Sequence, residues 1–426
     1  MWRLFETLDI LRWFAIARRW DREADRATLE ARQARLWARL RTRVLPRSPF
    51  YAARDDHPLM DKALWMAAFN EINTRGVRLE DAMAAAERAE ESRDFAPAID
   101  ALTVGLSTGT SGTRGVFLVS PAEQRRWAGV MLAKLARERP FARRRVAFFL
   151  RANSRLYESV KGSGRITFRF FDLMRPLEDC ARELDGFAPD MLIAPASVLR
   201  LLGEMQEAGQ LAVAPGRVVS VAEVLHEDDR AAIARAFGAP IGEVYQATEG
   251  LLATTCELGT LHLNEEWLRF EREPLNGRRF APIVTDLTRE TQPIVRYRLD
   301  DVLIAAERPC ACGRAAAAIE AIEGRCDDVC AFLGPDGTRV RVFPDFIVRA
   351  ILGADARVRD FRVVETAPGR LCISLLSDGD AHEAVRDALG ALAARLNARA
   401  PEIEFETYAP AGELKRRRVL RARSSP

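Results

Sequence analysis

The sequence has no long apolar run, no excess of charge of either sign and few histidines. No stretch approaches the roughly 20 apolar residues that a membrane-spanning helix needs. The 64 basic and 61 acidic side chains nearly balance, for a net charge of +3, so composition gives no reason to expect a nucleic-acid partner. The N-terminus lacks the apolar core of a signal peptide, and Glu6 and Asp9 argue against an acid-poor transit peptide. We expect a cytoplasmic enzyme without a transmembrane segment.

A disulfide framework is also disfavoured, because the seven cysteines are odd in number and scattered over 426 residues. Four soft ligands instead form two pairs, one with Cys-x₅-His spacing and one with Cys-x-Cys spacing. These are Cys256 with His262 and Cys310 with Cys312. Such a set suits a tetrahedral structural Zn²⁺, and the alternative is four unrelated residues. The other thiols are spare ligand candidates, Cys326 and Cys330, or core residues, Cys180 and Cys372.

What the sequence does have is apolar material for a large core, 48% of its residues, which predicts two or more domains. Residues 1–45 carry leucines at near-helical spacing among many arginines, and this pattern predicts two amphipathic helices. From Ser120 to Tyr245, short apolar segments alternate with helical ones, which predicts an α/β core with a mainly parallel sheet covered by helices. Ser120-Pro121-Ala122-Glu123 has the pattern of a capped helix start.

The order of elements changes beyond Gly324. Strand, helix, strand, strand, helix and strand follow one another, which predicts a small α+β domain of ferredoxin-like order. We therefore expect a large α/β core over residues 1–325 and a separate, mobile C-terminal domain over residues 326–426.

The most informative stretch runs from Ser107 to Gly115, Ser-Thr-Gly-Thr-Ser-Gly-Thr-Arg-Gly. Its glycines let backbone N–H groups turn inward, and its hydroxyls add further donors, so it predicts a phosphate-binding loop rather than a linker. The spacing matches neither the P-loop nor the G-x-G-x-x-G pattern, and no G-x-S-x-G elbow is present. A nucleotide site of a different kind is expected. The candidate phosphate ligands are Ser107, Thr108, Gly109, Thr110, Ser111 and Gly112.

Three further motifs follow in order. The first is Tyr245-Gln-Ala-Thr248-Glu249-Gly, in which an aromatic ring can stack on a purine, a hydroxyl can bind a phosphate and a carboxylate can hold Mg²⁺. The second is Arg296 to Asp301, which ends a predicted strand with adjacent carboxylates that suit a ribose diol. The third is Gly324-Arg-Cys-Asp-Asp328, which lies at the predicted domain boundary and could form a hinge. Each motif alone is weak, since each also fits an ordinary strand end or turn.

In this order, the motifs resemble those of the adenylate-forming superfamily of acyl-CoA synthetases, adenylation domains and luciferases. The similarity is closest to the phenylacetate-CoA ligase-like branch, which includes synthetases that adenylylate a deazaflavin coenzyme, and it spans essentially the whole chain. Two positions depart from the family pattern. Arg114 follows Thr113 where the family has proline and often lysine, and Asp300 stands where the wider superfamily prefers glycine.

The resemblance implies roles for residues of the N-terminal domain. The loop Thr108 to Gly112 would hold the β- and γ-phosphates of ATP. Tyr245 would flank the adenine, Thr248 would contact the α-phosphate and Glu249 would bind Mg²⁺. Asp301 would bind both ribose hydroxyls, and Arg298 or Arg325 would lie near the phosphates or ribose.

The resemblance also assigns roles near the C-terminus. Asp327 would be the pivot of the small domain, and Lys415 is the best match to the catalytic lysine that neutralises charge on the α-phosphate. The match is loose, because Leu414 replaces the usual glycine, and Arg416 or Arg417 could substitute.

The function implied is ATP-dependent adenylation of a small carboxylic acid to acyl-AMP with release of pyrophosphate. Transfer to a thiol would follow, either of coenzyme A or of a carrier-protein pantetheine. Cofactors would be ATP with Mg²⁺ and the structural Zn²⁺. Candidate protein partners are an acyl-carrier protein and a second copy of this chain in a homodimer. Alternatives are nucleotidyl transfer to a hydroxyl, a non-catalytic ATP-binding protein, and a peripheral membrane enzyme anchored by the arginine-rich residues 1–45.

Overall fold

A computed structural model describes residues 2–54, 56–92, 98–106, 115–135, 143–150, 166–173, 175, 177–325, 330–342, 344–355, 357–408 and 418–422. The chain divides into two compact units. Unit 1 comprises Met1–Leu299 and Ala305–Ala321, and unit 2 comprises Asp300–Ile304 and Ile322–Pro426. No helix among the described residues is both long and apolar enough to cross a membrane.

Unit 1 begins with the helices that the leucine spacing predicts. Asp25 caps the second of them, since its carboxylate accepts hydrogen bonds from the backbone N–H groups of Ala27 and Thr28. Residues 62–72 form two short helices, because the chain leaves helical geometry at Ala68. The helical elements are α1 (Trp2–Trp20), α2 (Arg26–Arg43), η1 (Leu45–Arg47), α3 (Pro49–Ala52), α4 (Lys62–Ala67), α5 (Phe69–Ile72) and α6 (Leu79–Ser92).

A small antiparallel sheet carries the glycine-rich stretch between two of its strands. The order is β1 (Ala98–Ile99), β2 (Leu102–Leu106) and β3 (Val116–Val119), and Leu106 pairs with Val116. The helix α7 (Pro121–Leu135) follows β3 at the predicted capped start. The Glu123 carboxylate accepts hydrogen bonds from the Ser120 backbone N–H and hydroxyl, which confirms the capping box.

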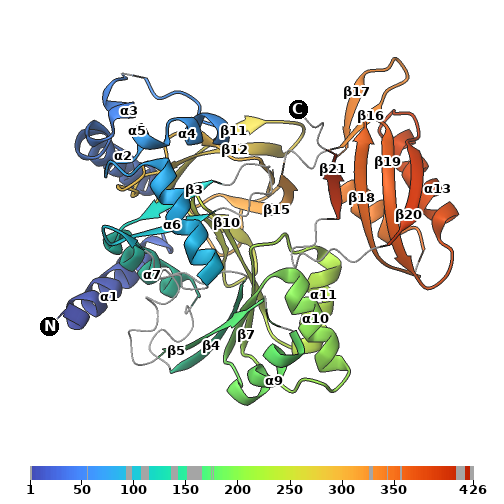
Figure 1. Ribbon diagram of the computed structural model, residues 1–426, viewed down its shortest axis with the longest axis horizontal. Helices are drawn as coiled ribbons and strands as arrows, with labels where there is room; N and C mark the ends of the chain where they lie inside the picture. The colour runs from blue at the N-terminus through green and yellow to red at the C-terminus, as the bar shows by residue number, and fades with distance from the viewer. Residues whose placement is uncertain are drawn as a thin grey trace. The chain divides into compact units, whose positions relative to one another are not determined.

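The parallel half of the large sheet fits the alternating pattern. Its order is β5-β4-β6-β7-β8, with every neighbouring pair parallel. Three helices connect these strands and lie beside them in Figure 1. The strands are β4 (Arg144–Leu150), β5 (Ile166–Asp172), β6 (Met191–Ala194), β7 (Arg217–Val221) and β8 (Ile241–Ala247), and the helices are α9 (Leu177–Phe187), α10 (Ala196–Glu207) and α11 (Glu227–Phe237).

The same sheet continues in an order of β9-β10-β15-β14-β12-β11, and the pairs β8·β9, β9·β10, β10·β15 and β11·β12 are antiparallel. The α/β core is therefore confirmed as a mixed sheet, with a parallel half crossed by α9, α10 and α11 and an antiparallel half that includes the tight β8–β9 and β11–β12 turns. The strands are β9 (Gly250–Thr255), β10 (Leu261–Leu263), β11 (Leu268–Pro274), β12 (Arg279–Asp286), β13 (Tyr297–Arg298), which pairs with β12, β14 (Asp301–Ala305) and β15 (Ala318–Arg325).

Unit 2 is α+β, as predicted, but its strand pairing differs from a ferredoxin-like sheet. The first expected strand, β17, pairs with β16 in a separate hairpin, and a strand near the C-terminus, β21, lies parallel to β18 instead. The sheet order is β20-β19-β18-β21. The elements are β16 (Cys330–Leu333), β17 (Arg339–Val342), α12 (Pro344–Leu352), β18 (Val358–Ala367), β19 (Arg370–Ser377), α13 (His382–Arg395), β20 (Glu402–Thr407) and β21 (Val419–Arg421).

Two observations show how α1 docks on the core of unit 1. At Gly129 of α7, an added Cβ would lie 2.6 Å from the Ile10 carbonyl oxygen and the Trp13 Cβ, so only glycine allows this close approach. Beside it, the Arg125 guanidinium donates to the Asp9 carboxylate at 2.8 Å. The sequence pattern predicted the helix, and the glycine fixes where it packs.

A buried ionic cluster fastens the end of α1 to the core. Lys134 Nζ lies 2.6 Å from Asp21 Oδ1 and also donates to the Glu266 carboxylate, and all three side chains are at most 7% exposed. Arg314 completes the cluster, since its guanidinium reaches the Asp21 carboxylate at 3.3 Å. Charges this deeply buried are tolerated only when paired, so each partner depends on the others.

Replacing Lys134 with methionine removes the cation that pairs with both Asp21 and Glu266, and only Asp21 keeps a second cation, Arg314. We expect Lys134→Met to lower the free energy of unfolding of unit 1 by about 3–5 kcal/mol. All seven tryptophans lie in unit 1, so urea unfolding followed by tryptophan fluorescence reports on this unit alone. As a control, Arg182→Ala removes an exposed cation paired with Asp179 and should change stability by about 0.5 kcal/mol or less. Equal effects of the two substitutions would contradict the assigned role of the cluster.

Candidate active site and metal centre

The turn between β8 and β9 presents the first group of predicted nucleotide ligands. Tyr245 is the fifth residue of β8 and is 8% exposed, while Thr248 and Glu249 are half-buried in the turn. Gly250 follows with φ of +155°, a backbone conformation that side-chain-bearing residues rarely adopt. The glycine thus reverses the chain immediately after Glu249, so that β9 pairs antiparallel with β8.

The buried Arg289 side chain joins this turn to the strand that follows the glycine-rich stretch. One guanidinium nitrogen of Arg289 donates to the Thr248 carbonyl oxygen at 2.8 Å, and another donates to the Leu118 carbonyl oxygen at 3.4 Å. The Leu118 backbone N–H donates to Gln292 Oε1 at 2.9 Å. The loop between β12 and β13 therefore holds β3 and the Thr248-Glu249 turn together.

Glu123 anchors that loop from the other side. Its carboxylate accepts hydrogen bonds from the backbone N–H groups of Glu290 at 2.7 Å and Thr291 at 3.0 Å, in addition to those from Ser120. Burial alone would raise the pKa of Glu123, but the charge of Arg289 and the hydrogen bonds of Thr291 and Ser120 outweigh it and lower the pKa to about 2. Glu123 is therefore a buried anion that balances the charge of Arg289.

The structure describes only some of the other predicted ligands. Arg298, on β13, donates from Nε to the Glu273 carboxylate on β11. Asp301 is the first residue of β14 and belongs to unit 2. The phosphate-loop residues 107–112, Asp327 and Lys415 lie outside the described residues, as does the side chain of Arg325. Their assigned roles stay predictions.

Sequence reasoning missed Arg289, Thr291 and Gln292. The capping box did identify Glu123 as a helix-start residue, but not its second set of partners. Arg289 stands in Thr-Arg-Glu-Thr-Gln, which looks like an exposed polar turn, although all three missed residues are at most 8% exposed. Their role depends on contacts more than 40 residues away in sequence, for which one sequence carries no signal.

Residues of three neighbouring parallel strands also share one apolar surface. Phe148, Ile193 and Val221, on neighbouring parallel strands, are buried in a single apolar cluster with Met131 of α7. The register places Phe148 opposite Ile193. This gives one face of the sheet an apolar lining next to the strand that carries Tyr245.

The two predicted soft-ligand pairs meet in space. Cys256 follows β9, His262 lies in β10, and Cys310 and Cys312 lie in the loop between β14 and β15. The four ligand atoms all lie within 4.8 Å of one another. Cys256 Sγ is 3.8 Å from Cys310 Sγ, and Cys312 Sγ is 3.3 Å from His262 Nε2.

This geometry fits a tetrahedral ion better than a disulfide. A Zn–S bond of about 2.3 Å implies an S···S edge of about 3.8 Å in a tetrahedron, which matches the observed separation, whereas a disulfide needs about 2.05 Å. His262 Nδ1 lies 2.8 Å from the Ala316 carbonyl oxygen, an acceptor that places the proton on Nδ1 and leaves Nε2 facing the thiols. Cysteine and histidine ligands in this ratio are typical of structural zinc sites.

The protonation of the thiols also favours ligation. Burial raises the pKa of Cys256. At Cys310 burial acts in the same direction, but hydrogen bonds from Thr260, the Cys312 backbone and His262 outweigh it and lower the pKa to about 6. At least one thiolate is therefore available near neutral pH as a metal ligand.

No protein-family model matches the sequence, and no curated protein is significantly similar to it. Solved structures do share its fold. A 2-hydroxyisobutyryl-CoA ligase in the postadenylation state, in complex with R3-HIB-AMP, is 16% identical with a TM-score of 0.68 over 94% of this chain and 91% of that chain. The same ligase in an open conformation with 2-HIB-AMP and CoA is 18% identical with a TM-score of 0.56, covering 93% and 91%. The amide bond synthetase McbA from Marinactinospora thermotolerans is 13% identical with a TM-score of 0.53, covering 73% and 66%.

The buried Glu123 carboxylate makes a prediction about acid stability. The unfolded chain binds a proton near pH 4.5, whereas the folded carboxylate does so near pH 2. Its contribution, about 3 kcal/mol, is therefore complete above about pH 5 and is lost as the pH falls from about 4.5 toward 2. In tryptophan-monitored urea unfolding, the free energy of unfolding should fall less between pH 6 and pH 3 for Glu123→Gln than for the wild-type protein. The control Glu204→Gln, at an exposed site, should show the same fall in the free energy of unfolding as the wild type. A wild-type fall in Glu123→Gln would contradict the assignment.

Proposed function

We propose, from the premise that this chain has the fold of the adenylate-forming ligases, that it activates a carboxylic acid with ATP as an acyl-adenylate and releases pyrophosphate. The acyl group then passes to a thiol, coenzyme A or a carrier-protein pantetheine. One observation carries the proposal. Arg289 hydrogen-bonds the carbonyl oxygens of Thr248 and of Leu118 in β3, the strand that follows the hydroxyl-rich stretch, and this supports placing the two motifs in one site.

The residues supply binding and electrostatic stabilisation rather than a nucleophile. Tyr245 would contact the adenine and Thr248 the α-phosphate, in the roles that the resemblance assigns. Glu249 would hold Mg²⁺, which supplies positive charge to the phosphates when bound. The attacking oxygen would come from the substrate carboxylate, so the rate enhancement rests on alignment and charge neutralisation at the α-phosphorus. The apolar cluster of Phe148, Ile193 and Val221 supports an acid with an apolar body.

Activity measurements test this reading directly. We expect acid-dependent exchange of pyrophosphate into ATP, and acyl hydroxamate when hydroxylamine is added. Glu249→Gln should lower kcat/KM for exchange by about 10²–10³, and Lys415→Ala should lower it as well. The control Glu204→Gln removes an exposed carboxylate of α10 that pairs with Arg200 and should leave the rate unchanged. An ATP-dependent phosphodiester product, or exchange indifferent to Glu249→Gln, would contradict the proposal.

The metal centre supports a second, structural part of the proposal. Cys256, His262, Cys310 and Cys312 would hold Zn²⁺ in a closed site with no open position for substrate. Beside it, Arg314 donates to the Asp21 carbonyl oxygen at 2.8 Å and to the Glu257 carboxylate at 2.6 Å. Zinc at this position would therefore hold the loop that carries Cys310 and Cys312, called the cysteine loop, against the C-terminal end of α1.

Metal analysis of the purified protein should give one zinc per chain. Cys312→Ser should lower the zinc content, and it should lower the midpoint of unit 1's tryptophan-monitored unfolding, because ligand binding free energy adds to folding free energy. Cys180→Ser changes a buried thiol outside the cluster and should keep the zinc. Protein that is fully folded and free of zinc, with no change on adding zinc, would contradict this assignment.

A further inference from the structure

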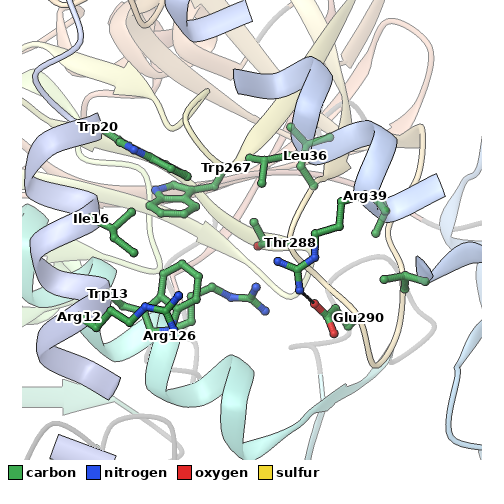
Figure 2. Close-up of a pocket in the computed structure, with 13 residues that line it drawn as sticks. Arg12, Trp13, Ile16, Trp20, Leu36, Arg39, Arg126, Trp267, Thr288 and Glu290 are labelled. Atoms are coloured by element: carbon green, nitrogen blue, oxygen red, sulfur yellow. Dashed lines mark hydrogen bonds and ion pairs between the residues drawn. The ribbon is translucent and has the colours of Figure 1, made fainter. Parts of the chain in front are cut away.

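A cavity of about 200 Å³ lies in unit 1 among α1, α2, α7 and the β12–β13 loop. Its walls are unusually aromatic and cationic (Figure 2). None of its lining residues belongs to the predicted nucleotide motifs or to the metal cluster. The residues that carry the argument below are Arg12, Trp13, Trp20, Arg39, Arg126 and Trp267.

Three indoles form the apolar part of the cavity. Trp20 and Trp267 lie against each other with ring centroids 4.5 Å apart, and Trp13 meets Trp267 edge-on at 6.0 Å. Figure 2 shows Trp20 and Trp267 together, with Trp13 on the other side of Trp267. Trp267 is 6% exposed, and its Nε1 has no hydrogen-bond partner among the described residues. A buried donor without a partner is costly, so an oxygen acceptor at this place would be stabilising.

The cations give the cavity a net positive charge. Arg39 donates to the Glu290 carboxylate at 2.8 Å, so that pair is neutral. Arg12 and Arg126 instead lie over the Trp13 ring, at 5.7 and 5.4 Å from its centroid, and neither has a carboxylate partner in the part of the chain that the structure describes. Two guanidinium groups held at one aromatic wall form a ready site for a planar anion.

We propose that this cavity binds a small aromatic carboxylate of about the size of benzoate. An apolar cavity of about 150 Å³ in another protein accommodates benzene, so about 200 Å³ holds a single ring with its carboxylate. The ring contacts the indoles, and the carboxylate contacts the guanidinium groups of Arg12 and Arg126. Neutral aromatics lack the charged contact and bind more weakly.

Titration of the full-length protein with benzoate tests this inference. Three of the seven tryptophans line the cavity, so we expect a saturable change in tryptophan fluorescence, with a parallel line broadening of 4-fluorobenzoate in ¹⁹F NMR. The variant Arg12→Gln/Arg126→Gln should weaken binding at least about tenfold. The matched control Arg19→Gln replaces an exposed cation of α1 that does not line the cavity, and it should bind as the wild type does.

Three results would overturn the inference. Benzamide binding as tightly as benzoate would show that the arginines recognise no charge. Unchanged binding by the double variant would place the ligand elsewhere. Loss of benzoate binding in Tyr245→Ala, with retention in the double variant, would assign the ligand to the predicted acyl-adenylate site instead. Because Arg12 is exposed, the single variant Arg12→Gln keeps the test available if the double variant does not fold.

Discussion

Two buried side chains of opposite charge hold the described part of the candidate active site together. Arg289 and Glu123 are each 8% exposed, and a charge at such depth must be compensated. Arg289 donates hydrogen bonds to two backbone carbonyl oxygens, and Glu123 accepts hydrogen bonds from two backbone N–H groups of the β12–β13 loop that carries Arg289. The charge of Arg289 favours the ionised form of Glu123, and both side chains are hydrogen-bonded to main chain. The consequence is a fixed distance between β3 and the Thr248-Glu249 turn, which side-chain packing alone would not impose.

The sequence was sufficient for the local structure of this region. Its alternation of strands and helices predicted the parallel half, most directly at β6 and β7, because a strand buried on both faces carries a continuous apolar run that is visible in sequence. The metal ligands were predictable for a related reason. Cysteine and histidine are rare enough here that their spacing alone selected Cys256, His262, Cys310 and Cys312, and the structure brings those four together.

Pairing between distant segments was not predictable. In unit 2, the six predicted elements are present, but β16 and β21 were not predicted. These two strands pair with β17 and β18, because strand order depends on contacts that no local pattern records. Arg289 and Lys134 were missed for the same reason. Each is an ordinary basic residue in an ordinary polar or helical context, and only its partners, far away in sequence, make it structurally important.

The connection between Arg314 and Asp21 has a consequence for how the protein is made. The two residues are separated by 293 positions, so the Asp21 carboxylate, which can meet Lys134 earlier, gains its second cation only when nearly three quarters of the polypeptide has been made. The first helix can pack on α7 as soon as that helix is made, but the buried ionic cluster at its end stays incomplete until late in synthesis. The contact that completes this cluster therefore forms late, once the loop that carries Cys310, Cys312 and Arg314 has been synthesised.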